Sequence, residues 1–353
     1  MCIFNSRHSI PCGIFVLSVL FLCTTQSAQD APTPDISKLP ILRAGIIGLD
    51  TSHVIAFTKT LNNPKATGYL AKVKVVAAYP GGSPDVTSSA TRVKGFTNDL
   101  KKIGIEIVNT IPALLEKVDV VLLESVDGRP HLKQVIPVFK SGKPVFIDKP
   151  LAGSLADAIA IDMLGKKYKT PWFSSSSLRF SPGIIGMRHS SKLTGDVQGV
   201  SAWGPCSTEP HHPDLFWYGV HGCEILYTIM GTGCQTVSRV TTKSGELVTG
   251  VWNNDRIGTF RGIRSPGKAG YGAMVFGKKG IAPSGGYTGY APLVEQIAKF
   301  FHTKQIPVDN AETLELFTFM EAADESKRQG GKPVSMKAVF DKAAKAARVH
   351  LKN

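Results

Sequence analysis

Short apolar runs alternate with amphipathic segments through the first half of the chain. Five apolar runs predict strands, at residues 42–48, 73–79, 105–109, 118–125 and 144–150. The segments between them predict helices, at residues 52–63, 110–117 and 131–142. Continuous Val, Ile and Leu runs are typical of strands buried on both faces, so the pattern indicates a parallel sheet covered by helices. We expect this α/β, doubly wound domain of the Rossmann type to span residues 41–172.

The second half has a different pattern. Short runs with turn signals between them predict strands at residues 197–204, 235–243, 247–253, 256–263 and 271–277. Two longer amphipathic segments, residues 291–303 and 311–329, predict helices, and Gly330-Gly331 ends the second one. Closely spaced strands favour a mostly antiparallel sheet. We therefore expect a C-terminal α+β domain over residues 173–353.

The first forty residues have the composition of a targeting segment. An apolar run at residues 10–23 follows a basic residue and is too short to cross a bilayer comfortably. Small and polar residues follow, with a cleavage site after Ser27 or Ala28. The pattern predicts a signal peptide at residues 1–28, a proline-containing linker at 29–40 and a secreted or periplasmic protein without stable membrane insertion after cleavage. An uncleaved membrane anchor is the alternative.

Charge and composition exclude some classes of protein. A hydrophobic content of 42% and a charged content of 19% are typical of a globular protein rather than a disordered one. The net charge is +14, but the basic residues are scattered and no basic run is interleaved with aromatic residues. The sequence therefore argues against a nucleic-acid partner. A basic surface would suit anionic substrates or envelope polymers, or it is simply solvated.

Cysteine and histidine residues cluster between residues 206 and 223, which suggests zinc at first sight. Their spacing matches no compact ligand pattern, so we expect no metal site. Cys206, Cys223 and Cys234 follow the signal segment, and an odd set of three is no disulfide framework. A Cys223–Cys234 bond and buried free thiols are both open.

The stretch RAGIIGLDTSHV, residues 43–54, begins like a dinucleotide-binding turn and then departs from it. Where G-x-G-x-x-G is expected, only Gly48 is kept, and Asp50 and His53 replace the other two glycines. The second glycine lets the backbone approach a pyrophosphate, so a carboxylate at that position would repel the ligand. Asp50, Thr51 or Ser52 would instead cap the following helix.

Four segments together resemble the glucose–fructose oxidoreductase/inositol dehydrogenase family, written Gfo/Idh/MocA. They are RAGIIGLD, the block from residue 118 to Asp148-Lys149-Pro150 and beyond, SLRFSPGI at 177–184 and YGVHGCEILYTIMG at 218–231. The tripeptide stands where the family has Glu-Lys-Pro. The resemblance covers residues 41 to about 335.

The resemblance implies hydride transfer between NAD or NADP and a hydroxyl-bearing carbon of a sugar or polyol. It implies Lys149 as the residue that contacts substrate and nicotinamide ribose, and His221 as the general acid/base. Trp217 replaces an aspartate of the family, and Glu224 would lie beside His221 at helical spacing and orient it. The implied cofactor-binding residues are Gly48, Asp50, Thr51, Ser52, His53, Ser125, His131, Lys149 and Pro150.

Other readings of the sequence remain open. Tyr218 is an alternative proton donor, and Arg179 is expected in a structural ion pair. The protein could be a non-catalytic ligand-binding protein that lost dinucleotide affinity, or a glycosidase that uses bound NAD. By analogy with the family, the outer face of the second sheet would suit a homo-oligomer.

The signal peptide gives a direct prediction. The mature protein should begin near Ala28 or Gln29 and should be found outside the cytoplasm. N-terminal sequencing of the purified native protein checks this, and an intact Met1 in a soluble cytoplasmic fraction would contradict it.

Overall fold

A computed structural model of the protein describes residues 35–264 and 269–351. The chain from Ile36 to Asn353 forms one compact unit. The expected signal peptide, residues 1–28, and most of the expected linker lie outside the described residues.

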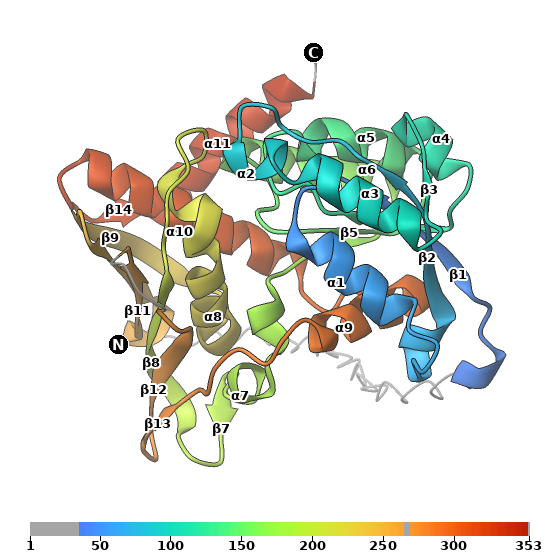
Figure 1. The fold of residues 1–353 in the computed structure, drawn as a ribbon. Coiled ribbons are helices and arrows are strands. Elements are labelled where there is room, and N and C mark those ends of the chain that lie inside the picture. Colours follow the sequence, from blue (N-terminus) through green and yellow to red (C-terminus); the bar gives the residue numbers. More distant parts are fainter. Residues whose placement is uncertain (1–34, 265–268, 352–353) are drawn as a thin grey trace, which may run out of the picture. The chain divides into compact units, whose positions relative to one another are not determined.

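The first sheet has six parallel strands in the order β3-β2-β1-β4-β5-β6 (Figure 1). Its strands are β1 (Leu42–Ile47), β2 (Val73–Tyr79), β3 (Glu106–Ile107), β4 (Val120–Leu123), β5 (Val145–Ile147) and β6 (Trp172–Ser174). The helices between them are α1 (Ser52–Leu61), α2 (Thr87–Ala90), α3 (Val93–Lys102), α4 (Ile111–Leu115), α5 (His131–Lys140) and α6 (Leu155–Tyr168). Short 3₁₀ turns are η1 (Ile36–Lys38), η2 (Gly68–Lys72) and η3 (Ser177–Phe180).

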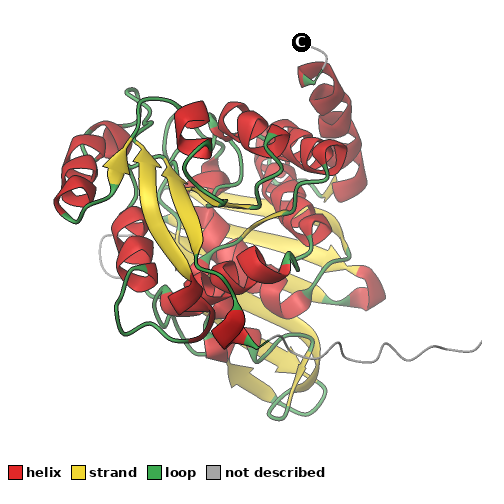
Figure 2. Cartoon of the chain, turned by 90° about the vertical axis from the view of Figure 1, so that its right-hand side faces the viewer, coloured by secondary structure: helices red, strands yellow, loops and turns green. Residues whose placement is uncertain are grey.

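Both faces of this sheet are buried, as the continuous apolar runs predict. Ile47 and Leu123 face a core shared with Val138 of α5. Ile46 and Leu122 face the opposite core, which includes Phe57 of α1. Neighbouring positions of one strand therefore enter different cores, because successive side chains of a strand point to opposite faces. Figure 2 shows the strands of the molecule with helices packed around them.

The second sheet has eight strands and is mostly antiparallel, which confirms the expected fold class. The strand order is β13-β12-β8-β11-β10-β9-β14, with β7 paired to β8 and a parallel pair formed by β8 and β11. The strands are β7 (Ser190–Ser191), β8 (Gly195–Pro205), β9 (Cys234–Thr242), β10 (Gly245–Trp252), β11 (Ile257–Ile263), β12 (Gly272–Gly277), β13 (Ile281–Pro283) and β14 (Val334–Ser335).

Helices of the second half pack on both sheets. They are α7 (Pro182–Ile185), a π-helical turn η4 (Leu215–Gly219), α8 (Val220–Met230), the 3₁₀ turn η5 (Asn253–Asp255), α9 (Ala291–Thr303), α10 (Asn310–Arg328) and α11 (Met336–His350). Leu293 and Ile297 of α9 belong to the core on the α1 face of the first sheet. The chain thus returns to the first sheet after completing most of the second.

A glycine sets the position of α8. A Cβ atom at Gly222 would lie 2.0 Å from the Phe260 ring on β11, so only glycine allows the helix this close to the sheet. The fully buried side chains of Val220, Cys223 and Leu226 add to this contact. Because His221 is next to Gly222, the packing also fixes where that imidazole lies.

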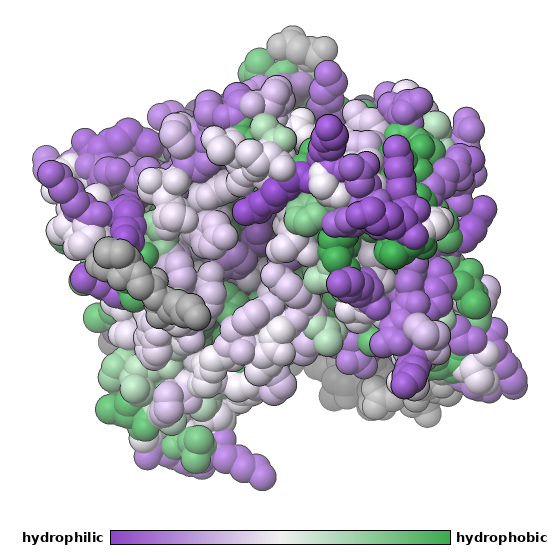
Figure 3. Space-filling view, viewed as in Figure 1, coloured by the Kyte–Doolittle hydropathy of each residue, from purple (hydrophilic) through white to green (hydrophobic). Residues whose placement is uncertain are grey.

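The outer face of the second sheet exposes a row of apolar side chains. Val240 lies opposite Leu247, and Val251 lies opposite Ile257 in the strand register. Their exposed fractions run from 38% to 64%. Figure 3 shows a further apolar area near β7 and β13, where Leu193 and Ile281 are exposed. No described helix is both long and apolar enough to cross a membrane.

The close approach of Gly48 to Ser125 gives a stability prediction. Gly48 has φ +89°, and a Cβ atom there would lie 2.3 Å from Ser125 Oγ. Gly48→Ala should reduce the free energy of unfolding by about 2–4 kcal/mol, from backbone strain together with the clash. Gly104 has φ +83° with nothing within 4 Å of its Cβ position, so Gly104→Ala should cost only about 1–2 kcal/mol. Urea unfolding of both variants checks this, and equal losses would contradict the close approach.

Candidate active site

A cavity of about 350 Å³ lies at the carboxyl ends of the parallel strands. The start of α1 contributes Thr51, Ser52 and His53 to its wall, and the chain after β5 contributes Lys149 and Pro150. From the second half come His221 and the aromatic side chains of Trp217, Tyr218, Tyr271, Tyr287 and Tyr290. Ligands of open parallel sheets bind at this edge, so the cavity is the candidate active site.

The turn after β1 keeps the backbone of a phosphate-binding loop. Gly48 adopts φ +89°, which favours glycine, and its N–H donates to Tyr79 O at 3.0 Å. Thr51 caps α1, with Oγ1 accepting from the His53 N–H at 3.4 Å. The N-terminus of α1 therefore opens into the cavity beside Ser52, whose side chain is exposed.

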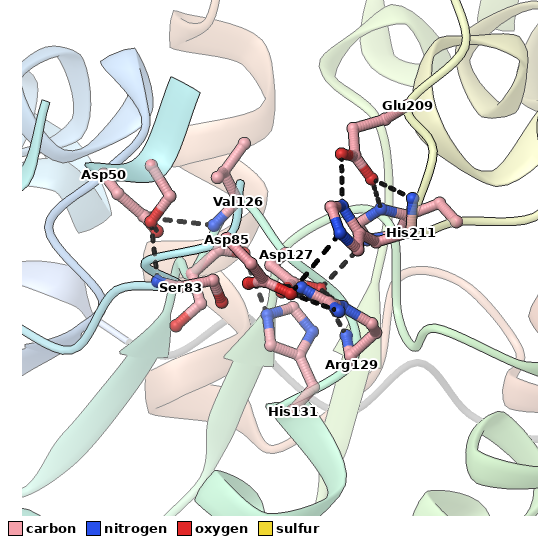
Figure 4. A network of polar contacts seen from close by, with 12 residues as sticks. Asp50, Ser83, Asp85, Val126, Asp127, Arg129, His131, Glu209 and His211 are labelled. Carbon is pink, nitrogen blue, oxygen red and sulfur yellow. Dashed lines mark hydrogen bonds and ion pairs between the residues drawn. The ribbon is translucent and has the colours of Figure 1, made fainter. Parts of the chain in front are cut away.

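Asp50 does not cap α1, and that expectation is wrong. Its carboxylate accepts the Val126 N–H at 2.8 Å and the Ser89 hydroxyl at 2.6 Å (Figure 4). Asp50 is fully buried, and burial raises the pKa of its carboxyl despite the hydrogen bonds from Ser89 and Val126, which lower it. The Asp50 side chain thus points toward the loop after β4, where it accepts the backbone N–H of Val126 at the ends of the strands.

A second carboxyl group beside Asp50 has no hydrogen-bond partner. Glu124 follows β4 directly and is fully buried, and within the described residues neither of its carboxyl oxygens is hydrogen-bonded. Burial raises the pKa of Glu124 well above its usual range, and the charges of Asp148 and Asp50 raise it further. Burial and the two neighbouring carboxylates thus disfavour the charged form of Glu124.

His53, at the third glycine position, pairs with the acid of the Asp-Lys-Pro tripeptide. Its Nδ1 lies 2.6 Å from Asp148 Oδ2, and the two side chains are 6% and 0% exposed. Asp148 Oδ1 also accepts the Lys149 N–H at 2.8 Å. Asp50 and His53, which replace two glycines of the motif, thus bind the turn to the ends of β4 and β5.

Ser125 and His131 lie beneath the site and do not line the cavity. Ser125 Oγ donates to Gln134 at 3.0 Å. The His131 ring is fully buried between two carbonyl groups, Ser125 O at 2.9 Å and Leu151 O at 3.1 Å. His131 begins α5, as predicted, and joins the loops after β4 and β5, while the contact of the two residues with cofactor stays a prediction.

Lys149 and His221 share the cavity, as the resemblance implies. Across the described ranges no hydrogen bond or ion pair engages the Lys149 ammonium group. His221 Nδ1 lies 2.7 Å from Ser176 Oγ. Burial lowers the pKa of His221 well below its usual range, and the nearby charges of Lys149 and His53 lower it further. His221 is thus a neutral imidazole at physiological pH.

Glu224 does not orient His221, which corrects the expectation from helical spacing. Its Oε1 accepts from Arg179 Nε at 2.5 Å and from the Ser175 hydroxyl at 3.0 Å. Arg179 also contacts Glu312 at 2.6 Å, and its guanidinium is 4% exposed. Arg179 is therefore in a structural ion pair, as expected, and Glu224 is its partner because a buried guanidinium requires a compensating carboxylate.

Tyr271, Tyr287 and Tyr290 are the residues of the aromatic wall that sequence reasoning missed. Tyr287 and Tyr290 lie in the loop between β13 and α9, and Tyr290 contacts the His53 ring edge-on at 4.7 Å. Tyr271 packs edge-on against His221, with ring centroids 5.7 Å apart. Burial raises the pKa of Tyr271 to about 12. The glycine-rich run SGGYTGY, residues 284–290, was the available signal, because such loops allow close approach to other segments.

Charged side chains join the two halves beside the cavity (Figure 4). Arg129 forms two hydrogen bonds of 2.9 Å with Asp85 and also contacts Asp127. His212 lies between Asp127 and Glu209, at 3.0 Å and 2.7 Å. Asp85 is thus engaged by Arg129.

The histidine and cysteine cluster holds no metal arrangement. The described residues contain no group of three or more potential ligands placed to bind one ion. Cys206, Cys223 and Cys234 are buried free thiols, so the alternative of a Cys223–Cys234 bond is not seen. Burial raises the pKa of Cys206 to about 11 and that of Cys234 to about 12, which makes these two thiols unreactive.

Comparison with known proteins gives fold-level similarity. Neither the family models nor the curated proteins match the sequence. The myo-inositol dehydrogenase of Lactobacillus casei, solved with NAD(H) and myo-inositol, has a TM-score of 0.66 and 15% identity, covering 84% of this chain and 96% of that one. The WlbA dehydrogenase of Chromobacterium violaceum, solved with NADH and UDP-GlcNAcA, has a TM-score of 0.67 and 15% identity with the same coverage.

A third similar structure is an oxidoreductase of Agrobacterium radiobacter in complex with NAD⁺, L-tartaric acid and magnesium. Its TM-score is 0.64 at 15% identity, and the match covers 84% of this chain and 99% of that one. The chain therefore has the fold of NAD-binding oxidoreductases.

The position of His212 gives a pH prediction. Burial lowers the pKa of His212, but Asp127 and Glu209 outweigh it and the pKa is raised above 6.5. Its stabilising effect is complete below pH 6.5 and is lost as pH rises through the raised value. Between pH 6 and pH 9 the wild type should lose more free energy of unfolding than His212→Gln. Urea unfolding at both pH values checks this, and parallel losses would mean that His212 does not titrate in the pair.

Proposed function

We propose that the chain is an exported NAD(P)-dependent oxidoreductase that transfers hydride to or from the hydroxyl-bearing carbon of a sugar or polyol. The observation that carries this proposal is the meeting of Lys149, His221 and the N-terminus of α1 in one cavity. An ammonium group, an imidazole and a helix N-terminus are the groups that organise a hydroxyl, move its proton and hold an anionic cofactor.

The cavity residues expected beside a nicotinamide fit a bound dinucleotide. The residues of the phosphate turn differ from the usual glycine motif. The backbone N–H groups at the start of α1, beside Ser52, would hold the phosphates, and Lys149 with Pro150 would lie beside the nicotinamide ribose. Ser88 and Arg92 also line the cavity and would extend the site toward the adenosine. Against this fit, Asp50 occupies the Val126 N–H, and Asp85 is bound to Arg129 rather than free for a ribose hydroxyl.

The proposed roles follow from the chemistry of the side chains. When bound, the nicotinamide accepts or supplies the hydride. Lys149 donates a hydrogen bond to the substrate oxygen and stabilises negative charge that develops there. His221, with Nδ1 against Ser176, presents its other ring nitrogen for a hydrogen bond or proton exchange. The tyrosines and Trp217 form an amphipathic wall, which suits a carbohydrate-like ligand because their rings are apolar and their edges polar.

A second candidate is a ligand-binding protein on the same fold that lacks dinucleotide affinity. The buried contacts of Asp50 with Val126 and Ser89 favour it, because they place a carboxylate in the phosphate turn. Native mass spectrometry of the purified protein separates the candidates. A co-purifying dinucleotide supports the oxidoreductase, and its absence together with no binding of added NAD⁺ or NADP⁺ supports the second candidate.

Loss of Lys149 or His221 should lower turnover more than binding. Reduction of NAD⁺ or NADP⁺ is followed by absorbance with a panel of sugars and polyols. Lys149→Ala and His221→Gln should each lower kcat, by about 10²–10⁴ for loss of a positioned acid/base residue. Lys133→Ala, on α5 and outside the cavity wall, is the matched control. Wild-type turnover in both cavity variants would remove the two residues from the reaction.

Replacement of Asp50 should increase dinucleotide affinity. Asp50→Gly removes the carboxylate and frees the Val126 N–H, so NAD⁺ or NADP⁺ should bind more tightly than to the wild type. Asp50→Asn keeps the shape and removes only the charge, which separates repulsion from steric filling. Titration calorimetry measures all three affinities. If they are equal, Asp50 has no influence on the cofactor phosphates.

A further inference from the structure

A buried carboxylate–imidazole pair forms part of the cavity wall. His53 Nδ1 and Asp148 Oδ2 are 2.6 Å apart. An ionised carboxylate can only accept, so Nδ1 carries the proton and donates it to Asp148. Burial raises the pKa of Asp148, but its interactions with Lys149 and its hydrogen bonds from His53 and the Lys149 N–H outweigh burial, and the net pKa is lowered. Asp148 therefore remains ionised.

Packing fixes the orientation of the His53 ring. Phe57 stacks on it, with ring centroids 5.1 Å apart and planes 10° apart. Tyr290 packs against it edge-on at 4.7 Å. No hydrogen-bond partner reaches Nε2 among residues 35–264 and 269–351, and His53 lines the same cavity as Lys149. With Nδ1 bound to Asp148, Nε2 is the nitrogen left for a ligand, and in the neutral ring it carries a lone pair.

His53 and His221 differ in what surrounds them. His221 has a hydroxyl, Ser176, as its partner, and burial with the charge of Lys149 lowers its pKa well below the usual range. Such a ring gains a proton poorly, because a base works best when its pKa is near the operating pH. Asp148 orients the His53 ring through Nδ1, as the acid of a catalytic triad does. Burial raises the pKa of nearby Glu124 well above its usual range, which disfavours its charged form.

We infer that His53, oriented by Asp148, is a second acid–base residue of this cavity and takes the proton of a substrate hydroxyl. The inference rests on the proposed function, which supplies the oxidised nicotinamide. The substrate O–H bond breaks and its proton moves to His53 Nε2. The oxygen electron pair forms the C=O bond as the carbon loses its hydride to the oxidant. Reduction runs the same steps in reverse, with His53 returning the proton.

Nitrogen NMR of the unliganded full-length protein tests the pair without turnover. The ring signals of His53 are assigned by their absence in His53→Gln. The neutral ring should carry its proton on Nδ1 and a lone pair on Nε2. In Asp148→Asn the two tautomers should mix, because an amide offers Nδ1 either an acceptor or a donor. A proton on Nε2 of the neutral wild-type ring would place a donor, not a base, in the cavity and would overturn the inference.

Rate–pH profiles test the proton transfer itself. His53→Gln should lower kcat by about 10²–10⁴ and abolish its rise with pH. His221→Gln should keep the rise, because its ring stays neutral across the range. His212→Gln is the structural control, since that ring also pairs with a carboxylate, Asp127, but does not line the cavity. A rise with pH that persists in His53→Gln overturns the inference.

The two tests also separate this inference from the proposed function. If the wild type reduces neither NAD⁺ nor NADP⁺ with any compound of the panel, the proposed function fails. The acid–base role of His53 then fails with it, and the NMR result still shows separately whether Nε2 is a free base. If the wild type is active and only the His53 profile is unchanged, the inference fails and the proposed function stands. Thermal unfolding of each variant confirms that it is folded.

Discussion

Buried carboxyl groups at the ends of three neighbouring strands organise this molecule. Asp50 follows β1, Glu124 follows β4 and Asp148 follows β5, and all three are fully buried. Three charges in so small a volume would repel strongly. The structure places them in three different environments: Asp50 accepts two hydrogen bonds, burial raises the pKa of Glu124 well above its usual range, and Asp148 is paired with His53. The loops of the cavity depend on these contacts.

The same contacts explain how the turn after β1 can form when only one of the three glycines of the motif is present. In a dinucleotide turn the glycines leave room for the ligand's phosphates. In this chain Asp50 fills part of that room and ties the turn to Val126, while His53 ties it to Asp148. The backbone of the turn is therefore preserved by side chains of the protein itself. On the β4 side Asp50 occupies the Val126 N–H, whereas the start of α1 opens into the cavity.

The cavity is completed by the second half of the chain. Tyr290 packs on His53, and His221 reaches the cavity from α8. Beside it, His212 joins Asp127 of the loop after β4 to Glu209 of the segment before α8, and Arg129 joins the same loop to Asp85. Desolvation offsets much of the attraction within the buried His212–Asp127 pair. These contacts fix the position of the segment before α8 relative to the loop after β4.

The sequence by itself determined the two sheets, most of their strands and the position of the site. Apolar periodicity is a local property, so β1, β2, β4, β5, α9 and α10 could be read from it. Lys149 and His221 followed from a motif resemblance. The hydrogen-bond partners of the buried carboxylates could not be predicted from the sequence. Asp50 contacts Val126, 76 residues away, and Glu224 contacts Arg179 rather than His221. Which acid pairs with which base depends on distances between remote segments, and only the tertiary structure decides those.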